Sequence, residues 1–189
     1  MELTPEERQR IYAVVLVVFA SGVLAGCTIT NGTRQDPGGW RDAKWGMTGP
    51  EILKAFGGEA VLLKEPEHFK DKFASVGIDN MPFPGIPTET LKARFLLDST
   101  TKQLVQVNIS PQTTTFTAAD AERFYDALRS GFVQKYGAPT VKSQKSGTRK
   151  EVWLFPSTAV ELSIWDMKPI KLLFVNLAYR DGKLLDSEN

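Results

Sequence analysis

The chain is poor in the residues that build most catalytic and metal sites. It has 1 cysteine and 1 histidine among 189 residues, so a zinc site of several cysteines or histidines is excluded. A serine–histidine–acid triad would have to use His68, and the nucleophile pattern Gly-x-Ser-x-Gly does not occur. Neither Gly-x-x-x-x-Gly-Lys nor Gly-x-Gly-x-x-Gly is present. We therefore expect no metal, no cofactor and no enzymatic activity, although paired carboxylates stay open because sequence does not show their proximity.

Neither sign of charge dominates, and no intrachain disulfide is available. The chain carries 23 lysines and arginines against 22 aspartates and glutamates, a formal net charge of +1 at pH 7. Nucleic-acid binding needs an excess of positive charge, so this balance predicts no nucleic-acid partner. Because Cys27 is the one cysteine, the domain must be stabilised by its hydrophobic core alone.

The first long apolar run has the order of an export signal. Residues 11–20 are apolar, Arg8 and Arg10 precede them, and small residues such as Ser21 and Gly22 follow. A basic region, an apolar region and a small-residue cleavage site in that order are typical of a secretory signal peptide. The sequence therefore predicts export from the cytoplasm.

The run ends in Leu24, Ala25, Gly26 and Cys27, which resembles the lipobox of bacterial lipoproteins. The resemblance implies cleavage before Cys27, lipidation of its thiol and acylation of its new amino group. A bilayer would then be one partner of the protein, through the acylated cysteine. Thr28 stands where an aspartate would retain such a protein in the inner membrane, so the resemblance implies the periplasmic face of the outer membrane, with an inner-membrane anchor as the alternative.

Other interpretations of this segment stay open. Residues 11–29 are uncharged and close to the roughly 20 residues that span a bilayer, so a transmembrane helix is one alternative. Cys27 as a small buried apolar residue is another. The leader also contains Glu2, Glu6 and Glu7, which a start assigned too early would explain.

The remaining chain divides into a tether, one domain and a tail. We expect residues 1–26 to be the signal peptide, 27–39 the lipidated cysteine with a flexible tether, 40–181 a single domain and 182–189 a polar tail. Residues 28–39 lack hydrophobic periodicity and end in turn-forming residues, which is typical of a linker.

Hydrophobic periodicity predicts helices and strands in alternation. A helix begins at Thr48, where Glu51 completes a capping box, and a longer helix runs from Thr117 to Tyr136. Residues 64–89 contain several prolines and are expected to be irregular, with a possible short helix over 67–74. Strands are predicted over 60–63, 91–97, 105–109, 141–145, 150–155, 159–165 and 171–179. The last strand is apolar on both faces, which predicts a place near the middle of the sheet.

This order predicts an α+β domain with helices packed on one face of a mostly antiparallel β-sheet. No internal sequence repeat is evident. The helix start Trp45-Gly46-Met47-Thr48 and the helix end Tyr136-Gly137-Ala138-Pro139 resemble those of small uncharacterised envelope lipoproteins. More distantly, the plan is similar to the accessory lipoprotein of the barrel-assembly machine and to the β-lactamase inhibitor proteins. No functional residue is carried over from these families.

Two sets of apolar residues are candidate partner contacts. Met81 and Phe83 lie in the 79–87 segment as the apolar tips of an expected loop, and Trp153, Phe155 and Trp165 are expected on the outward face of their strands. Exposed apolar patches mark interaction sites, so we expect a non-catalytic module that binds an envelope protein or assists assembly. Two alternatives stay open, namely that residues 28–47 or 64–89 cover this face, or that the protein carries a small apolar ligand between helix and sheet.

Overall fold

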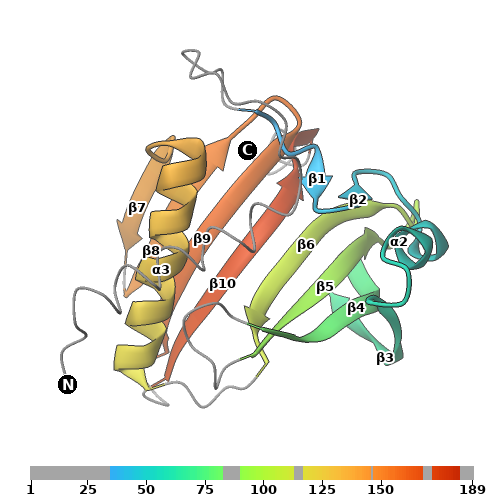
Figure 1. The fold of residues 1–189 in the computed structure, drawn as a ribbon, viewed down its shortest axis with the longest axis horizontal. Coiled ribbons are helices and arrows are strands. Elements are labelled where there is room, and N and C mark those ends of the chain that lie inside the picture. The colour runs from blue at the N-terminus through green and yellow to red at the C-terminus, as the bar shows by residue number, and fades with distance from the viewer. Residues whose placement is uncertain (1–34, 83–89, 113–116, 146, 168–171, 184–189) are drawn as a thin grey trace.

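The computed structural model describes residues 35–82, 90–112, 117–145, 147–167 and 172–183 (Figure 1). The predictions for Leu24, Ala25, Gly26, Cys27 and Phe83 lie outside these residues. Within them, no helix has the length and apolar character that crossing a bilayer requires.

The described elements are two helices and ten strands. The helices are α2 (Gly49–Ala55) and α3 (Ala118–Tyr136). The strands are β1 (Gly39–Trp40), β2 (Ala43–Lys44), β3 (Val61–Phe69), β4 (Lys72–Pro82), β5 (Thr90–Asp98), β6 (Leu104–Pro111), β7 (Val141–Lys145), β8 (Thr148–Leu154), β9 (Thr158–Met167) and β10 (Leu172–Asp181).

Eight strands form one antiparallel sheet in the order β3-β4-β5-β6-β10-β9-β8-β7. Each half is a meander of four consecutive strands, and the two meanders meet where β6 pairs with β10 (Figure 1). The predicted place of the last strand near the middle of the sheet is confirmed, because β10 has neighbours on both sides.

A helix followed by a four-stranded meander occurs twice in the chain. The first unit is α2 with β3–β6, and the second is α3 with β7–β10. In both, an aromatic residue, Phe56 or Tyr136, stands at the helix end directly before a glycine, and the edge strand begins at Val61 or Val141. Because β6 and β10 are antiparallel, a local twofold axis between them relates the strand orders of the two meanders, whereas α2 packs on β4 and α3 packs on β9 and β10.

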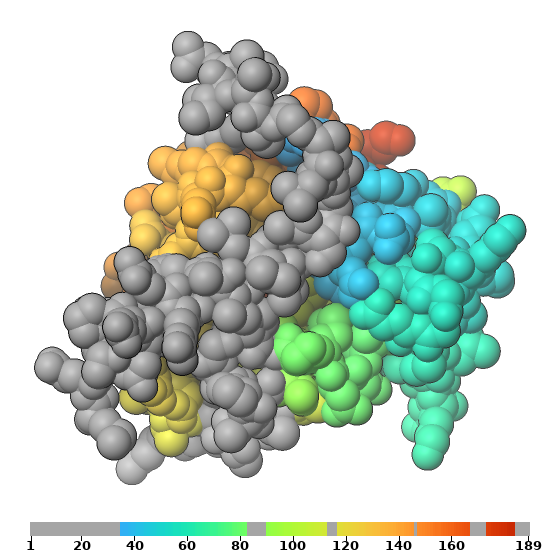
Figure 2. Space-filling model, viewed as in Figure 1, coloured from blue at the N-terminus to red at the C-terminus, as the bar shows by residue number. Residues whose placement is uncertain are grey.

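One face of the sheet carries the hydrophobic core. The predicted helix over 117–136 is confirmed, and its buried stripe lies against β9 and β10, with the Phe132 ring 5.3 Å from that of Trp153. On the other half, Trp40 of β1 and Phe56 after α2 pack on Phe95, with ring centroids 5.8 and 5.2 Å away. In the space-filling view, β1, β2 and α2 form the right flank of the molecule and α3 lies on the left (Figure 2).

The local signals at the helix starts are also confirmed. The Glu51 carboxylate accepts a hydrogen bond from the Thr48 backbone N–H at 2.7 Å, and the Thr117 hydroxyl oxygen accepts one from the Asp120 N–H at 3.2 Å. These contacts satisfy backbone donors that the first helical turn leaves without intrahelical partners.

The predicted α+β class, with helices packed on one face of a mostly antiparallel sheet, is wrong. The described chain is mostly β, with an eight-stranded antiparallel sheet, a two-stranded sheet of β1 and β2, and helices of only 7 and 19 residues. The main error is in residues 64–82. They were expected to be irregular with a possible short helix over 67–74, but together with the predicted strand over 60–63 they form the β3–β4 hairpin.

Beyond Leu63, the β3 strand was missed because it does not alternate. It is an edge strand with no fully buried residue, and its register with β4 shifts between Leu62 and Glu67. Pro66 lies within this shift and cannot donate to a strand ladder, so it is tolerated at an edge but argues against a strand in sequence.

Candidate functional site: the outer face of the sheet

The side of the sheet opposite the helices, which we call the outer face, is best defined by one cross-strand row. The row passes through every strand of the large sheet in register: Val61, Gly77, Arg94, Asn108, Ala178, Glu161, Val152 and Val141. The neighbouring row carries Phe95, Val107, Tyr179, Val160 and Trp153, which belong to the core.

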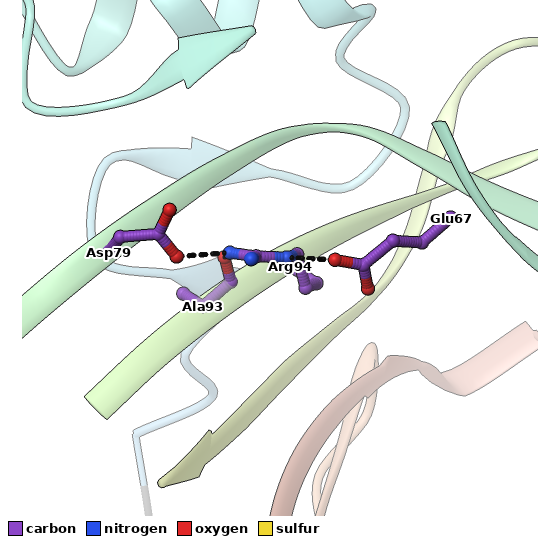
Figure 3. Close-up of polar contacts among 4 residues, drawn as sticks. All are labelled: Glu67, Asp79, Ala93 and Arg94. Carbon is purple, nitrogen blue, oxygen red and sulfur yellow. Dashed lines mark hydrogen bonds and ion pairs between the residues drawn. The ribbon is translucent and has the colours of Figure 1, made fainter. Parts of the chain in front are cut away.

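Arg94 joins three strands on the outer face. Its Nε donates to Glu67 of β3 at 2.7 Å and its Nη1 donates to Asp79 of β4 at 2.8 Å, with a further contact to the Ala93 carbonyl at 3.2 Å (Figure 3). Burial lowers the pKa of Arg94, but the hydrogen bonds to Glu67 and Asp79 outweigh it and raise this pKa above its ordinary value. The guanidinium therefore stays charged, and we call Arg94, Glu67 and Asp79 the first triad.

Gly77 makes room for this arrangement. A Cβ atom at Gly77 would lie 2.7 Å from Arg94 Nη1 and 3.0 Å from both the Ala93 carbonyl oxygen and Leu63 Cδ2. These distances are shorter than ordinary van der Waals contacts, so any larger residue would displace the guanidinium or the neighbouring strand. The glycine lets the arginine lie across β4 and reach both carboxylates.

Glu161 has the reverse arrangement in the second half of the sheet. Its carboxylate lies 2.7 Å from Lys150 Nζ of β8 and 3.6 Å from Arg180 Nη2 of β10. Only 9% of the Glu161 side chain is exposed, so two cations compensate a carboxylate that is largely removed from water. We call Glu161, Lys150 and Arg180 the second triad.

Small and uncharged polar residues lie between the two triads. Gln106 donates from Nε2 to Asn108 Oδ1 at 2.6 Å on β6, and Ser163 Oγ donates to the Asn176 carbonyl at 3.4 Å between β9 and β10. Ala178 is fully buried among these side chains. The middle of the outer face is therefore polar and hydrogen-bonded within the sheet.

An aromatic pair lies on the outer face at the end of β9. Trp165 pairs in register with Phe174 of β10, their ring centroids are 5.8 Å apart, and 41% of Trp165 is exposed. At the opposite end of the neighbouring strand, Leu154 is 40% exposed. Exposed tryptophan is enriched among the residues that dominate protein–protein interfaces.

The other predicted contact residues lie elsewhere. Trp153 is fully buried under α3 and donates from Nε1 to the Gly137 carbonyl at 2.8 Å, and Phe155 is buried with its ring 5.0 Å from that of Tyr136. The expected outward orientation of Trp153 and Phe155 is therefore wrong. Met81 is half-buried in β4 and packs partly against the core, so it is not the tip of a loop.

The error at Trp153 has an electrostatic cause. Arg149 and Glu151 share its face of β8, and charged residues are usually found on the solvent-facing side of a strand. The α3 helix supplies partners for both: Glu122 pairs with Arg149, and Arg129 Nε donates to Glu151 at 2.9 Å. Charged residues can therefore lie on the core side of this strand, and the alternation was interpreted with the wrong phase.

Other chemistry receives little support from the described residues. Among them, His68 is exposed in β3 and no group of 3 or more histidine, cysteine, aspartate or glutamate residues is placed to hold a metal. A cavity of about 540 Å³ lies between the first turns of α3 and the sheet. It is lined by charged residues as well as apolar ones, which does not suit a small apolar ligand: Ala118, Glu122, Gln144, Gly147, Arg149, Ile164, Asp166 and Leu173.

Sequence reasoning missed the two triads. Arg94 and Glu161 are polar residues that alternate with apolar ones along their strands, and their partners come from other strands of the same meander, which only the strand register brings together. The one available signal was a glycine, Gly77, in the middle of a strand, since such a glycine often marks a close approach of another group. That signal was hidden because β4 was not predicted.

Comparisons of the chain with protein-family models, with curated proteins and with solved structures found no match.

Proposed function

We propose that this protein is a bacterial envelope lipoprotein, anchored by lipid on Cys27 at the periplasmic face of the outer membrane, and that it binds another protein through its outer face without catalysing a reaction. The anchor is supported by the signal-like leader and the Leu24-Ala25-Gly26-Cys27 sequence. The observation that carries the binding role is the exposed Trp165 beside Phe174 on a sheet face that neither helix covers.

The position of the tether supports a partner in the periplasm. The Asp36 carboxylate accepts a hydrogen bond from the Ser157 N–H at 2.5 Å, which ties the start of the domain to the turn between β8 and β9. Trp165 lies at the other end of β9, about 26 Å away for a strand that rises roughly 3.3 Å per residue. With the tether attached at one end of the sheet, the aromatic pair lies at the far end and is available to a soluble protein surface.

Site-specific photo-crosslinking in intact envelopes tests the binding role. A photoreactive residue in place of Trp165 should give a crosslinked protein product that mass spectrometry identifies. The matched control carries the same residue in place of Gln134, which is exposed on α3 on the opposite side of the sheet. Equal crosslinking from both positions, or none from position 165, contradicts a role for the outer face.

A further inference from the structure

We propose that the partner of the outer face is a second copy of this chain. This inference rests on the proposed function, because it takes the outer face to be a protein-binding surface. It concerns the identity of the partner, which the proposed function leaves undefined.

The two triads are related by position and opposite in charge. Arg94 and Glu161 lie in the same cross-strand row, each on the third strand of its meander. The first triad has one positive and two negative groups, and the second has one negative and two positive groups. The two triads therefore carry opposite net charges, negative for the triad over β3–β5 and positive for the triad over β8–β10.

This pattern is self-complementary for one simple arrangement. A second copy can be rotated by 180° about an axis that is parallel to the strands, centred over the β6–β10 boundary and placed just beyond the outer face, and the two outer faces then meet. The β5 strand of one copy then lies over β9 of the other, because both strands are equally far from the axis. Each first triad meets a second triad, and the interface is closed and symmetric, as in most homodimers.

The outer face is also large enough for such a dimer. Eight strands spaced about 4.8 Å apart span about 38 Å, and six residues along a strand span about 20 Å. That gives about 750 Å² from each copy, close to the roughly 800 Å² per partner of a standard protein interface. One oppositely charged pair that would meet is accessible, since the side chains of Asp79 and Lys150 are 36% and 40% exposed.

The edges of the sheet are less suited to self-association than its face. An unpaired edge strand can pair with another chain unless proline, lysine or a bulge prevents it. The β3 edge has Pro66 and a register shift, and the short β7 edge has Lys142 and Lys145. Within the described residues, association through the charged outer face is therefore favoured over strand addition.

Charge reversal in full-length, membrane-anchored protein tests this inference. Two differently tagged copies are co-expressed and co-purified from envelopes. Asp79→Lys in both copies, or Lys150→Glu in both, should lower co-purification at least about tenfold, because like charges then face each other. One copy with Asp79→Lys and the other with Lys150→Glu should restore it, because each altered side again meets an opposite charge. Asp126→Lys, on the exposed side of α3, is the control and should have no effect.

Crosslinking from position 165 gives an independent outcome that does not depend on charge variants. A product of twice the chain mass, with peptides from this chain alone, supports the second copy. A product with a different protein leaves the proposed function in place and overturns this inference, whereas no product contradicts both. Co-purification that neither single reversal lowers, or that the mixed pair does not restore, also overturns it.

Discussion

Trp153 Nε1 donates a hydrogen bond to the Gly137 carbonyl at 2.8 Å and so joins the last residues of β8 to the C-terminal end of α3. The indole is fully buried against Phe132. The indole N–H satisfies a carbonyl just beyond the helix, and the ring fills the core below the helix. Together they fix which face of β8 is internal. Loss of the Trp153 side chain should therefore lower the stability of the domain and leave partner binding by the folded protein unchanged.

Substitution of Trp153 separates packing from hydrogen bonding. Trp153→Ala should lower the free energy of unfolding by about 3–5 kcal/mol, as for other buried aromatics. Trp153→Phe keeps most of the ring but loses the Nε1 donor, so it should cost less. Chemical denaturation measures both values. Equal stability of Trp153→Ala and the wild-type protein is incompatible with the observed burial.

The stripe of α3 can be tested in the same way. Phe124 is 2% exposed, so Phe124→Ala should cost about 3–5 kcal/mol of unfolding free energy. Arg123, the preceding residue, has a side chain that is 63% exposed, and Arg123→Ala should change stability by less than about 1 kcal/mol. Similar effects at both positions would mean that the helix presents a different face to the sheet.

Gly77 and Arg94 should be energetically coupled. Gly77→Ala places a Cβ atom against the guanidinium and should cost about 1–3 kcal/mol, the usual range for overpacking. In the Arg94→Ala background the same change should cost less, because the nearest clashing atom is gone. A double-mutant cycle by urea denaturation measures the difference, and strict additivity would show that the two residues do not interact.

Asp36 holds the first described residues against the turn between β8 and β9, and the stability of this contact should depend on pH. Burial raises the pKa of Asp36, but hydrogen bonds from the Gly38 and Ser157 backbone N–H groups outweigh it and hold this pKa below its ordinary value. A lowered folded-state pKa means that the stabilisation is present above the unfolded-state pKa of about 3.9 and is lost as the pH falls through the folded-state value.

The corresponding variant is Asp36→Asn, which has no carboxylate to ionise. It should be less stable than the wild-type protein at pH 7, and the difference should shrink as the pH is lowered below about 4. Urea denaturation across that range measures it. A difference that stays constant with pH, or grows towards low pH, would contradict the assigned role of the ionised carboxylate.

The lipid anchor is tested by Cys27→Ser. If the cysteine is acylated, incorporation of a labelled fatty acid into the chain should be lost and the precursor should keep its leader. A transmembrane helix over residues 11–29 would instead give no labelled fatty acid and no leader cleavage in the wild-type protein either. Normal lipid labelling of the variant would contradict Cys27 as the attachment site.

Several features follow from local sequence alone. The helix over 117–136, its cap at Thr117 and its buried stripe were predicted because hydrophobic spacing and capping are local properties. The central place of β10 followed from apolar residues on both of its faces. The proposed lipid anchor also depends on local sequence, and it stays a prediction because Cys27 lies outside the described residues.

The tertiary structure alone decided the mostly β class, the burial of Trp153 and the two triads. An edge strand such as β3 is stabilised by its neighbour and needs no hydrophobic alternation of its own. Trp153 faces inward because α3 neutralises the charges beside it on β8, a contact between segments distant in sequence. Arg94 and Glu161 acquire opposite surroundings only when strands from different parts of each meander align, since ion pairs between strands depend on register and not on composition.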